Sequence, residues 1–258
     1  IVNCKIKIPA KLNDFILSSA KQFAHYTYVP QGIDDLLLLY AGVSIDRNKF
    51  PKINKGYPWQ LHSQICASGC EIGFTDVRSW LAFLESVDFS FGTRIHGNIA
   101  AVLAGTPTFI FASDGRILEL ARYHQIQQMT AEDINEDTDI FKIYERADFS
   151  SVLQGHKQRF THYATFLEQN GLEHIYIKGD EYGISPFDEK MAEIPQNGTL
   201  KPLNKLPLKE QAAHLQEYYA FIKSESERQS GWLQLMKRVT GILPETLNAK
   251  LAQYCSRF

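Results

Sequence analysis

The chain has 258 residues, 44% of them apolar, so it can bury a core of normal size in one large domain or in one compact domain with a helical appendage. Its net charge is −2 and its Lys and Arg residues are scattered, which excludes the basic stripe that a nucleic-acid-binding surface needs. No run of eighteen apolar residues occurs, so we expect no transmembrane helix.

In the first two-thirds of the chain, strand-like segments alternate with segments whose apolar residues recur at helical spacing. We expect Asp34 and Asp76 to be helix N-caps, and Val77 to lie on the buried face of its helix. The predicted strands are 2–8, 26–30, 87–91 and 106–112, the predicted helices are 12–23, 34–41, 76–86, 97–103 and 115–124, and a surface loop is predicted over 47–57.

This alternation, with its short connections, predicts an α/β fold on a parallel sheet that helices cover on both faces. Ligands of such sheets lie beyond the carboxyl ends of the strands. We therefore expect a site in the loops around residues 92–96 and 113–116.

The character of the chain changes after residue 150. Pro, Gly and Asn are frequent in the stretch that we interpret as a linker, and the tail after it has a helical pattern that breaks around Gly241 and Pro244. The expected parts are a donor-binding domain (1–150), a helix that closes it (151–177), a linker or extended loop (178–208) and a helical tail (209–258).

The candidate chemistry lies in residues 89–107, FSFGTRIHGNIAAVLAGTP. An apolar strand reaches Gly92, and the chain then presents Arg94 and His96, which share one face while the backbone is extended. A helix follows, whose first turn offers unpaired N–H groups and a partial positive charge. The planar fork of an Arg binds carboxylate or phosphate, and a His can exchange a proton near neutral pH. Gly92 and Gly97 would let the backbone approach a ligand closely.

The alternative interpretation of the same residues is structural. An Arg and a His at a strand–helix junction often form only a salt bridge and a cap. Spacing alone leaves both interpretations open.

The stretch 92–107, followed by an apolar strand and Asp114-Gly115-Arg116, resembles the polysaccharide pyruvyltransferase family. Tyr28-Val29-Pro30-Gln31 resembles the upstream segment of the same family, so the resemblance covers roughly residues 2–126. It implies a Rossmann-like lobe of a GT-B-like, two-lobed transferase. It also implies phosphoenolpyruvate as donor, a glycan or lipid-linked oligosaccharide as acceptor, and no other cofactor.

The resemblance gives roles to individual residues. Arg94 and His96 fall on the Arg and His positions of the family and are the expected catalytic residues. The expected donor-binding residues are Gln31, Gly92, Thr93, Arg94, Gly97, Asp114 and Arg116. Gln127 replaces a Pro that many members have after the helix. The sequence lacks an initiator Met and the N-terminal lobe of the family, so we expect an N-terminal portion to be missing.

Some of these residues have plainer interpretations. Asp114 precedes a helix and is suited to N-capping, and Arg116 and Glu119 could lie on an exposed helix face. Gln31 lies just beyond a predicted strand. His62, Cys66 and Cys70 are spaced by four and would share one helix face, but they lack a fourth metal ligand, so no metal site is expected.

The four cysteines are few and widely placed, which is typical of a reduced cytoplasmic protein. The tail mixes Trp232 and several aliphatic residues with Lys237 and Arg238, so it could touch the inner face of a membrane. Packing against the domain or against the other lobe is the favoured alternative. Three functions compete with pyruvyl transfer: a nucleotide-sugar glycosyltransferase of GT-B type, a non-catalytic module that binds an anionic sugar, and an inactive fragment that needs its other lobe.

Overall fold

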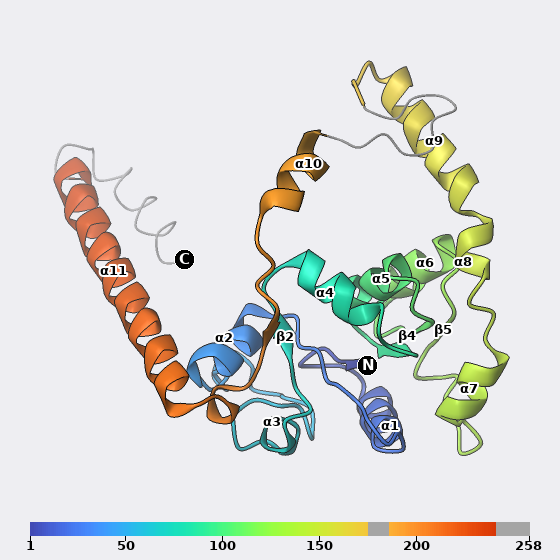
Figure 1. Ribbon diagram of the computed structural model, residues 1–258, viewed down its shortest axis with the longest axis horizontal. Coiled ribbons are helices and arrows are strands. Elements are labelled where there is room, and N and C mark those ends of the chain that lie inside the picture. Colours follow the sequence, from blue (N-terminus) through green and yellow to red (C-terminus); the bar gives the residue numbers. More distant parts are fainter. Residues whose placement is uncertain (175–185, 241–258) are drawn as a thin grey trace. The chain divides into compact units, whose positions relative to one another are not determined.

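A computed structural model describes residues 1–174 and 186–240. At its centre is a parallel sheet of four short strands (Figure 1). In spatial order these are β1 (Val2–Asn3), β3 (Ser90–Gly92), β4 (Thr108–Phe111) and β5 (Gln128–Met129). The predicted α/β class and parallel sheet are confirmed, although each strand is shorter than its apolar run.

Two single parallel bridges continue the sheet beyond β1. Val2 pairs with Tyr28, and Tyr28 pairs with Glu71. Numbered along the chain, the six positions therefore lie in the spatial order 3-2-1-4-5-6, which is the order of a Rossmann fold. The order reverses between β1 and β3, and in such sheets the ligand crevice opens beyond the carboxyl ends of the strands at this point.

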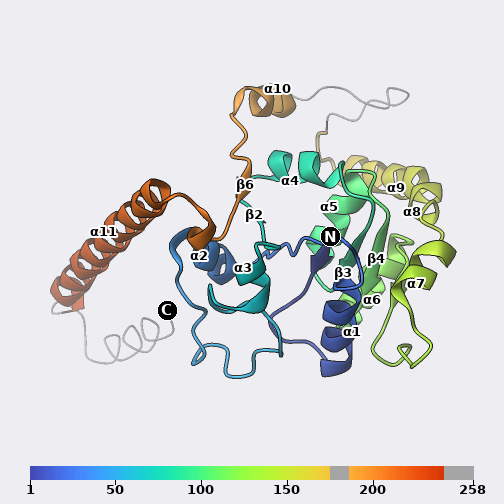
Figure 2. The same cartoon turned by 60° about the horizontal axis from the view of Figure 1, so that its bottom comes forward.

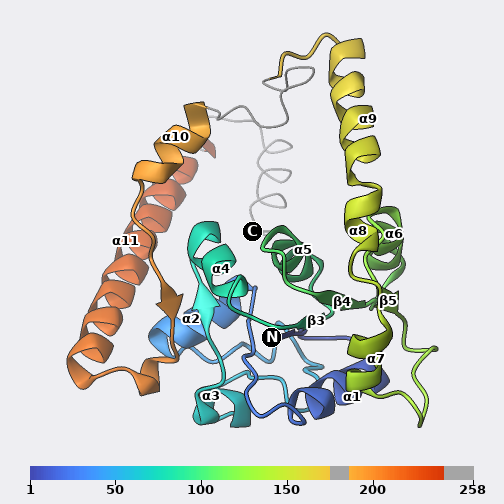
Figure 3. The ribbon, with the colours of Figure 1, turned by 45° about the vertical axis from the view of Figure 1, so that its right-hand side comes forward.

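Helices cover both faces of the sheet, as Figures 1 and 3 show. Phe91, Phe109 and Phe111 belong to the large core on the face of α1 (Ala10–Ala20) and α7 (Ile140–Arg146). The other face carries α4, α5 and α6, where Ile95, Ile110 and Ile117 form a second core. Their bounds are Val77–Leu84 for α4, Ile95–Leu103 for α5 and Gly115–Tyr123 for α6.

A smaller group of helices and strands follows Tyr28 in the sequence. It contains α2 (Ile33–Ala41), α3 (Gln64–Ser68) and β2 (Gly73–Phe74). The strand β2 pairs antiparallel with β6 (Thr199–Leu200), and the short 3₁₀ helix η1 (Leu203–Lys205) packs against α2 (Figure 2).

The stretch predicted as a linker is therefore only partly irregular. It includes α10 (Pro186–Glu193) and β6. The N–H groups of Asn197 and Gly198 donate to Asp76 and Ser79 at 3.0 and 2.9 Å, and Leu203 is buried. Because these contacts join residues about 120 positions apart, the local Pro and Gly content could not reveal them.

The remaining helices are α8 (Ser151–Gln154), α9 (His156–Gln169) and α11 (Leu208–Thr240). The chain divides into one unit over Ile1–Leu206 and a second from Pro207 onward. The predicted break of the tail at Gly241 and Pro244 lies outside the described residues. Among the helices that are described, none combines the length and the apolarity needed to cross a bilayer.

The first residues of α4 and α2 show whether the predicted N-caps are correct. Asp76 caps α4, accepting the Ser79 N–H at 2.7 Å, as predicted. Asp34 is not the cap of α2: Gly32 is, and the Asp35 side chain three residues later accepts the Gly32 N–H at 2.9 Å. Val77 is 62% exposed, so its predicted burial is wrong.

Candidate active site

The carboxyl ends of β1 and β3 lie in close contact at the switch point, which is the place where the strand order reverses. Gly92 has a φ of +147°, and a Cβ there would collide with the backbone oxygen of Asn3. The Thr93 N–H donates to that oxygen at 2.9 Å, and the Thr93 hydroxyl accepts the Lys5 N–H at 2.9 Å. Both Gly92 and Thr93 are buried. The absence of a side chain at Gly92 therefore lets the Asn3 backbone approach closely, and the predicted contact of Gly92 with a ligand stays a prediction.

A buried amide pair fixes the turn that follows. Asn98, fully buried on α5, donates to the carbonyl oxygens of Gly92 and Arg94 at 3.2 and 3.0 Å. The Asn3 side chain accepts the Arg94 N–H at 2.8 Å and donates to Asn98 at 3.4 Å. Neither Asn3 nor Asn98 is among the predicted site residues. The sequence could have indicated them only because each is a polar residue within an apolar segment. A polar side chain that is buried there normally needs hydrogen-bond partners.

Arg94 lies at this turn as the N-cap of α5, and its side chain makes no capping bond. Its Nε donates to the backbone oxygen of Cys4 at 3.1 Å, and its Nη2 lies 3.4 Å from Oδ2 of Asp35. The side chain remains 24% exposed. Arg94 is thus an oriented cation at the carboxyl edge of the sheet, beside the positive end of a helix.

His96 lies in the first turn of α5 and is exposed. Because the helix begins at Ile95, the backbone between Arg94 and His96 is not extended, and the predicted shared face is wrong. Side chains two positions apart at a helix start do not face each other. His96 adjoins the site through its position in the first turn of α5.

Gln31 and Gly97 meet, although they are distant in sequence. A Cβ on Gly97 would collide with the Gln31 side-chain amide. Gly97 therefore lets the Gln31 side chain approach α5 closely, and its predicted contact with a ligand stays a prediction. The Nε2 atom of Gln31 is buried and has no hydrogen-bond partner among the described residues. The structure thus brings the Gln31 side chain to the first turn of α5, against Gly97.

The loop after β4 brings a second charged group to the same edge. Asp114 caps α6 by accepting the Ile117 N–H at 3.0 Å, as predicted, and it also pairs with Lys5 Nζ at 2.6 Å. The hydrogen bond from Lys5 is the main cause that lowers the pKa of Asp114. Arg116 and Glu119 are exposed, as the plainer interpretation expected. Lys5 was not predicted, and it adds a cation at the end of β1.

A buried acid and thiol pair, Glu71 and Cys66, lies where the sheet continues beyond Tyr28. Glu71 is fully buried, and the Cys66 thiol donates to its Oε2 at 2.5 Å. Burial, with a smaller contribution from the charge of Asp35, raises the pKa of Glu71 to about 8. The predicted shared face of His62, Cys66 and Cys70 is wrong, because α3 ends at Ser68.

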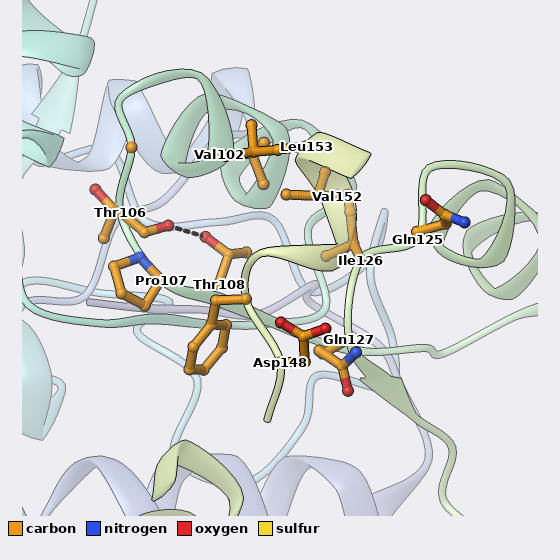
Figure 4. Close-up of a pocket in the computed structure, with 12 residues that line it drawn as sticks. Val102, Thr106, Pro107, Thr108, Gln125, Ile126, Gln127, Asp148, Val152 and Leu153 are labelled. Atoms are coloured by element: carbon orange, nitrogen blue, oxygen red, sulfur yellow. Dashed lines mark hydrogen bonds between the residues drawn. The ribbon is translucent and has the colours of Figure 1, made fainter. Parts of the chain in front are cut away.

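A cavity of about 100 Å³ lies at the opposite edge of the sheet, where β4 and β5 begin (Figure 4). Val102, Pro107, Ile126 and Val152 give it an apolar lining. None of the predicted site residues contributes to it. The cavity and the Arg94 edge are therefore separate features of the sheet.

Residues 14–115 match the family model described as "Polysaccharide pyruvyl transferase". The resemblance to this family is thereby confirmed over these residues, which include Gln31, Arg94, His96 and Asp114 but not Arg116. The polysaccharide pyruvyl transferase family implies a transferase that acts on a polysaccharide. No curated protein and no solved structure matches the chain.

Proposed function

We propose that this chain moves pyruvate from phosphoenolpyruvate onto two hydroxyls of a glycan, as a ketal, in the biosynthesis of a cell-surface polysaccharide. The observation that carries the proposal is the position of Arg94. It lies within the segment that matches the polysaccharide pyruvyl transferase family, at the switch point between β1 and β3. An oriented guanidinium beside a helix N-terminus is suited to a small anionic donor.

The proposed reaction has two additions to one carbon. A proton is delivered to the methylene carbon of phosphoenolpyruvate, which leaves an oxocarbenium-like centre at the neighbouring carbon. One glycan hydroxyl attacks that centre, and the carbon–oxygen bond to phosphate then breaks. The second hydroxyl closes the ring. The two hydroxyl protons balance the proton added to the methylene carbon and the proton taken by the released phosphate.

Each residue at the edge has a role in this scheme. Arg94 and the first turn of α5 hold the carboxylate or phosphate of the donor, and Lys5 adds positive charge at the end of β1. His96, exposed in the same turn, supplies the proton to carbon or accepts one from a hydroxyl. Gln31 turns its amide toward Gly97 and borders the same turn.

Gly92, Thr93, Gly97 and Asp114 support the site in this proposal without needing to touch the donor. Their described contacts are with Asn3, Lys5, Gln31 and the start of α6. We also propose that the acceptor is held with the help of a second lobe in a GT-B-like arrangement. The reaction would then take place in the cytoplasm, at or near the inner face of the membrane.

Ligand-dependent melting separates this proposal from a nucleotide-sugar glycosyltransferase. A ligand that binds only the folded state stabilises it by about 2.7 kcal/mol at a hundredfold excess over Kd. We expect phosphoenolpyruvate to raise the melting temperature and uridine diphosphate glucose to leave it unchanged, with Arg94→Ala abolishing the shift. A shift with the nucleotide sugar alone would contradict the proposal. Binding of phosphoenolpyruvate without acceptor-dependent phosphate release would indicate a non-catalytic module.

A further inference from the structure

The guanidinium of Arg94 is held by segments that are remote in sequence, and it also interacts with the Tyr57 hydroxyl. Cys4, 90 positions earlier, accepts from Nε, and Asp35, 59 positions earlier, lies against Nη2. A long and flexible side chain is thereby fixed at its charged end. Fixing an Arg side chain costs conformational entropy, so the contacts that fix Arg94 must offset that cost.

Asp35 is itself fixed before it meets Arg94. It is 3% exposed, and the Tyr57 hydroxyl donates to its Oδ1 at 2.7 Å. The Gly32 N–H donates to Oδ2 at 2.9 Å, the same oxygen that faces Arg94. A Cβ on Gly32 would crowd the Asp35 carboxylate, at 2.8 Å from Oδ2, and would lie in ordinary contact with Arg94, at 3.6 Å from Nη2. Burial raises the pKa of Asp35, opposed by the bonds from Tyr57 and Gly32 and by the charge of Arg94. The carboxylate is therefore a rigid support with defined geometry.

The Asp35–Arg94 contact is not that of a pair built for maximal strength. Charge-assisted bonds are usually about 2.7–2.9 Å long, and strong Arg–carboxylate pairs use two parallel bonds. Here the distance is 3.4 Å, through one Nη atom, and 24% of the Arg94 side chain stays exposed. The contact orients the guanidinium and leaves part of its fork for another anion.

We propose that Asp35 is a positioning residue that holds the Arg94 guanidinium in place for the anionic donor, with the Tyr57 hydroxyl fixing the Asp35 carboxylate. The inference rests on the proposed function, because it takes Arg94 as the donor-binding cation. Asp35 acts through Arg94 and does not touch the donor. A fixed guanidinium binds and orients an anion without first being ordered.

The first test does not depend on activity. Exchange of the Arg94 Nε–H with solvent is followed by ¹⁵N NMR in the full chain and in Asp35→Asn, Tyr57→Phe and Asp34→Asn. Asp34 is the matched control because its carboxylate pairs with Lys49 at the surface. We expect Asp35→Asn to speed exchange roughly tenfold, the effect of losing one net hydrogen bond. Tyr57→Phe should also speed the exchange of the Arg94 Nε–H, and Asp34→Asn should leave its rate unchanged. Wild-type exchange in folded Asp35→Asn and Tyr57→Phe overturns the inference.

The second test uses turnover. Asp35→Asn should lower kcat for phosphate release from phosphoenolpyruvate by roughly 10- to 100-fold, as expected for a misplaced binding group. The KM for phosphoenolpyruvate should rise, because the Arg94 guanidinium is no longer ordered before the donor binds. In an Arg94→Ala background Asp35→Asn should have no further effect. A purely structural Asp35 would instead lower activity in both backgrounds, together with the melting temperature.

The two tests distinguish a failure of the proposed function from a failure of the positioning role of Asp35. If the full-length wild type releases no phosphate with any acceptor, the proposed function is wrong, and the exchange measurement still decides whether Asp35 positions Arg94. If the wild type is active and both Asp35→Asn and Tyr57→Phe match its kcat, the positioning role is wrong and the proposed function stands. Tyr57→Phe keeps the inference testable if Asp35→Asn does not fold.

Discussion

Gly92 and Asn3 lie against each other at the ends of two neighbouring parallel strands, with no space for a side chain between them. A Cβ on Gly92 would collide with the Asn3 oxygen, and the φ of Gly92 is +147°. Gly92→Ala should therefore lower the free energy of unfolding by about 3 kcal/mol or more. Gly115→Ala is the control, because a Cβ there meets no atom within 4 Å. Urea denaturation of both variants makes the comparison, and equal stability would show that the strand ends are not joined this way.

His96 is exposed in the first turn of α5, so its removal should leave the fold intact. If His96 is the proton donor or acceptor, His96→Ala should lower kcat by roughly 10²- to 10⁴-fold with an unchanged melting temperature. His162→Ala, an exposed substitution on α9, should keep wild-type turnover. Near-normal turnover of His96→Ala would remove His96 from the mechanism.

Asp114 has two partners whose energies can be separated. Asp114→Ala removes both the cap of α6 and the partner of Lys5, and should cost about 1 kcal/mol of stability. Asp114→Asn keeps a capping oxygen and loses only an exposed ion pair, so its stability should lie within about 0.5 kcal/mol of the wild type. Urea denaturation distinguishes the two. An equal loss of stability in Asp114→Asn and Asp114→Ala would mean that the ion pair, and not the cap, dominates.

Glu71 gives the stability of the fold a characteristic dependence on pH. Its pKa is about 8 in the folded chain, against an ordinary value of 4.5. Between these values the folded state binds more protons than the unfolded state, so the contribution of Glu71 to stability is complete below pH 4.5 and is lost as the pH rises toward 8. Each unit of pH in that window should lower stability by at most about 1.4 kcal/mol from this group.

Glu71→Gln tests this dependence, since an amide fits the same space without titrating. The difference in unfolding free energy between wild type and Glu71→Gln should shift steadily against the wild type from pH 5 to pH 8. Glu119→Gln, an exposed substitution on α6, should show no such trend. A difference that does not vary with pH would mean that Glu71 is ionised throughout.

The elements that could be predicted from the sequence are those that depend on near neighbours. Asp76 and Asp114 were identified as caps because a cap bonds an N–H only three residues away. The helices and the parallel sheet followed from apolar spacing. The same reasoning predicts Asp34 as the cap of α2, because it is an acidic residue at the start of an apolar helical pattern, and only the fold shows that Gly32 is the cap.

The features that could not be predicted depend on residues far apart in the chain. Arg94 was identified as the key cation, but its contacts with Cys4 and Asp35 are set by the order of the strands. The sequence predicts that Gly92 and Gly97 let the backbone approach a ligand, but it does not reveal that Asn3 and Gln31 lie against them in the fold. Local spacing indicates which residue types occur together, and tertiary packing decides what each of them touches.

The most direct test is acceptor-dependent phosphate release from phosphoenolpyruvate, measured on the full-length protein with a panel of glycans, wild type beside Arg94→Ala. We expect the wild type to release phosphate only with a glycan that has a suitable hydroxyl pair, and Arg94→Ala to be at least about a hundredfold slower. Release by Arg94→Ala at the wild-type rate, or no release by the wild type with any acceptor, would contradict a donor site at the guanidinium between β1 and β3.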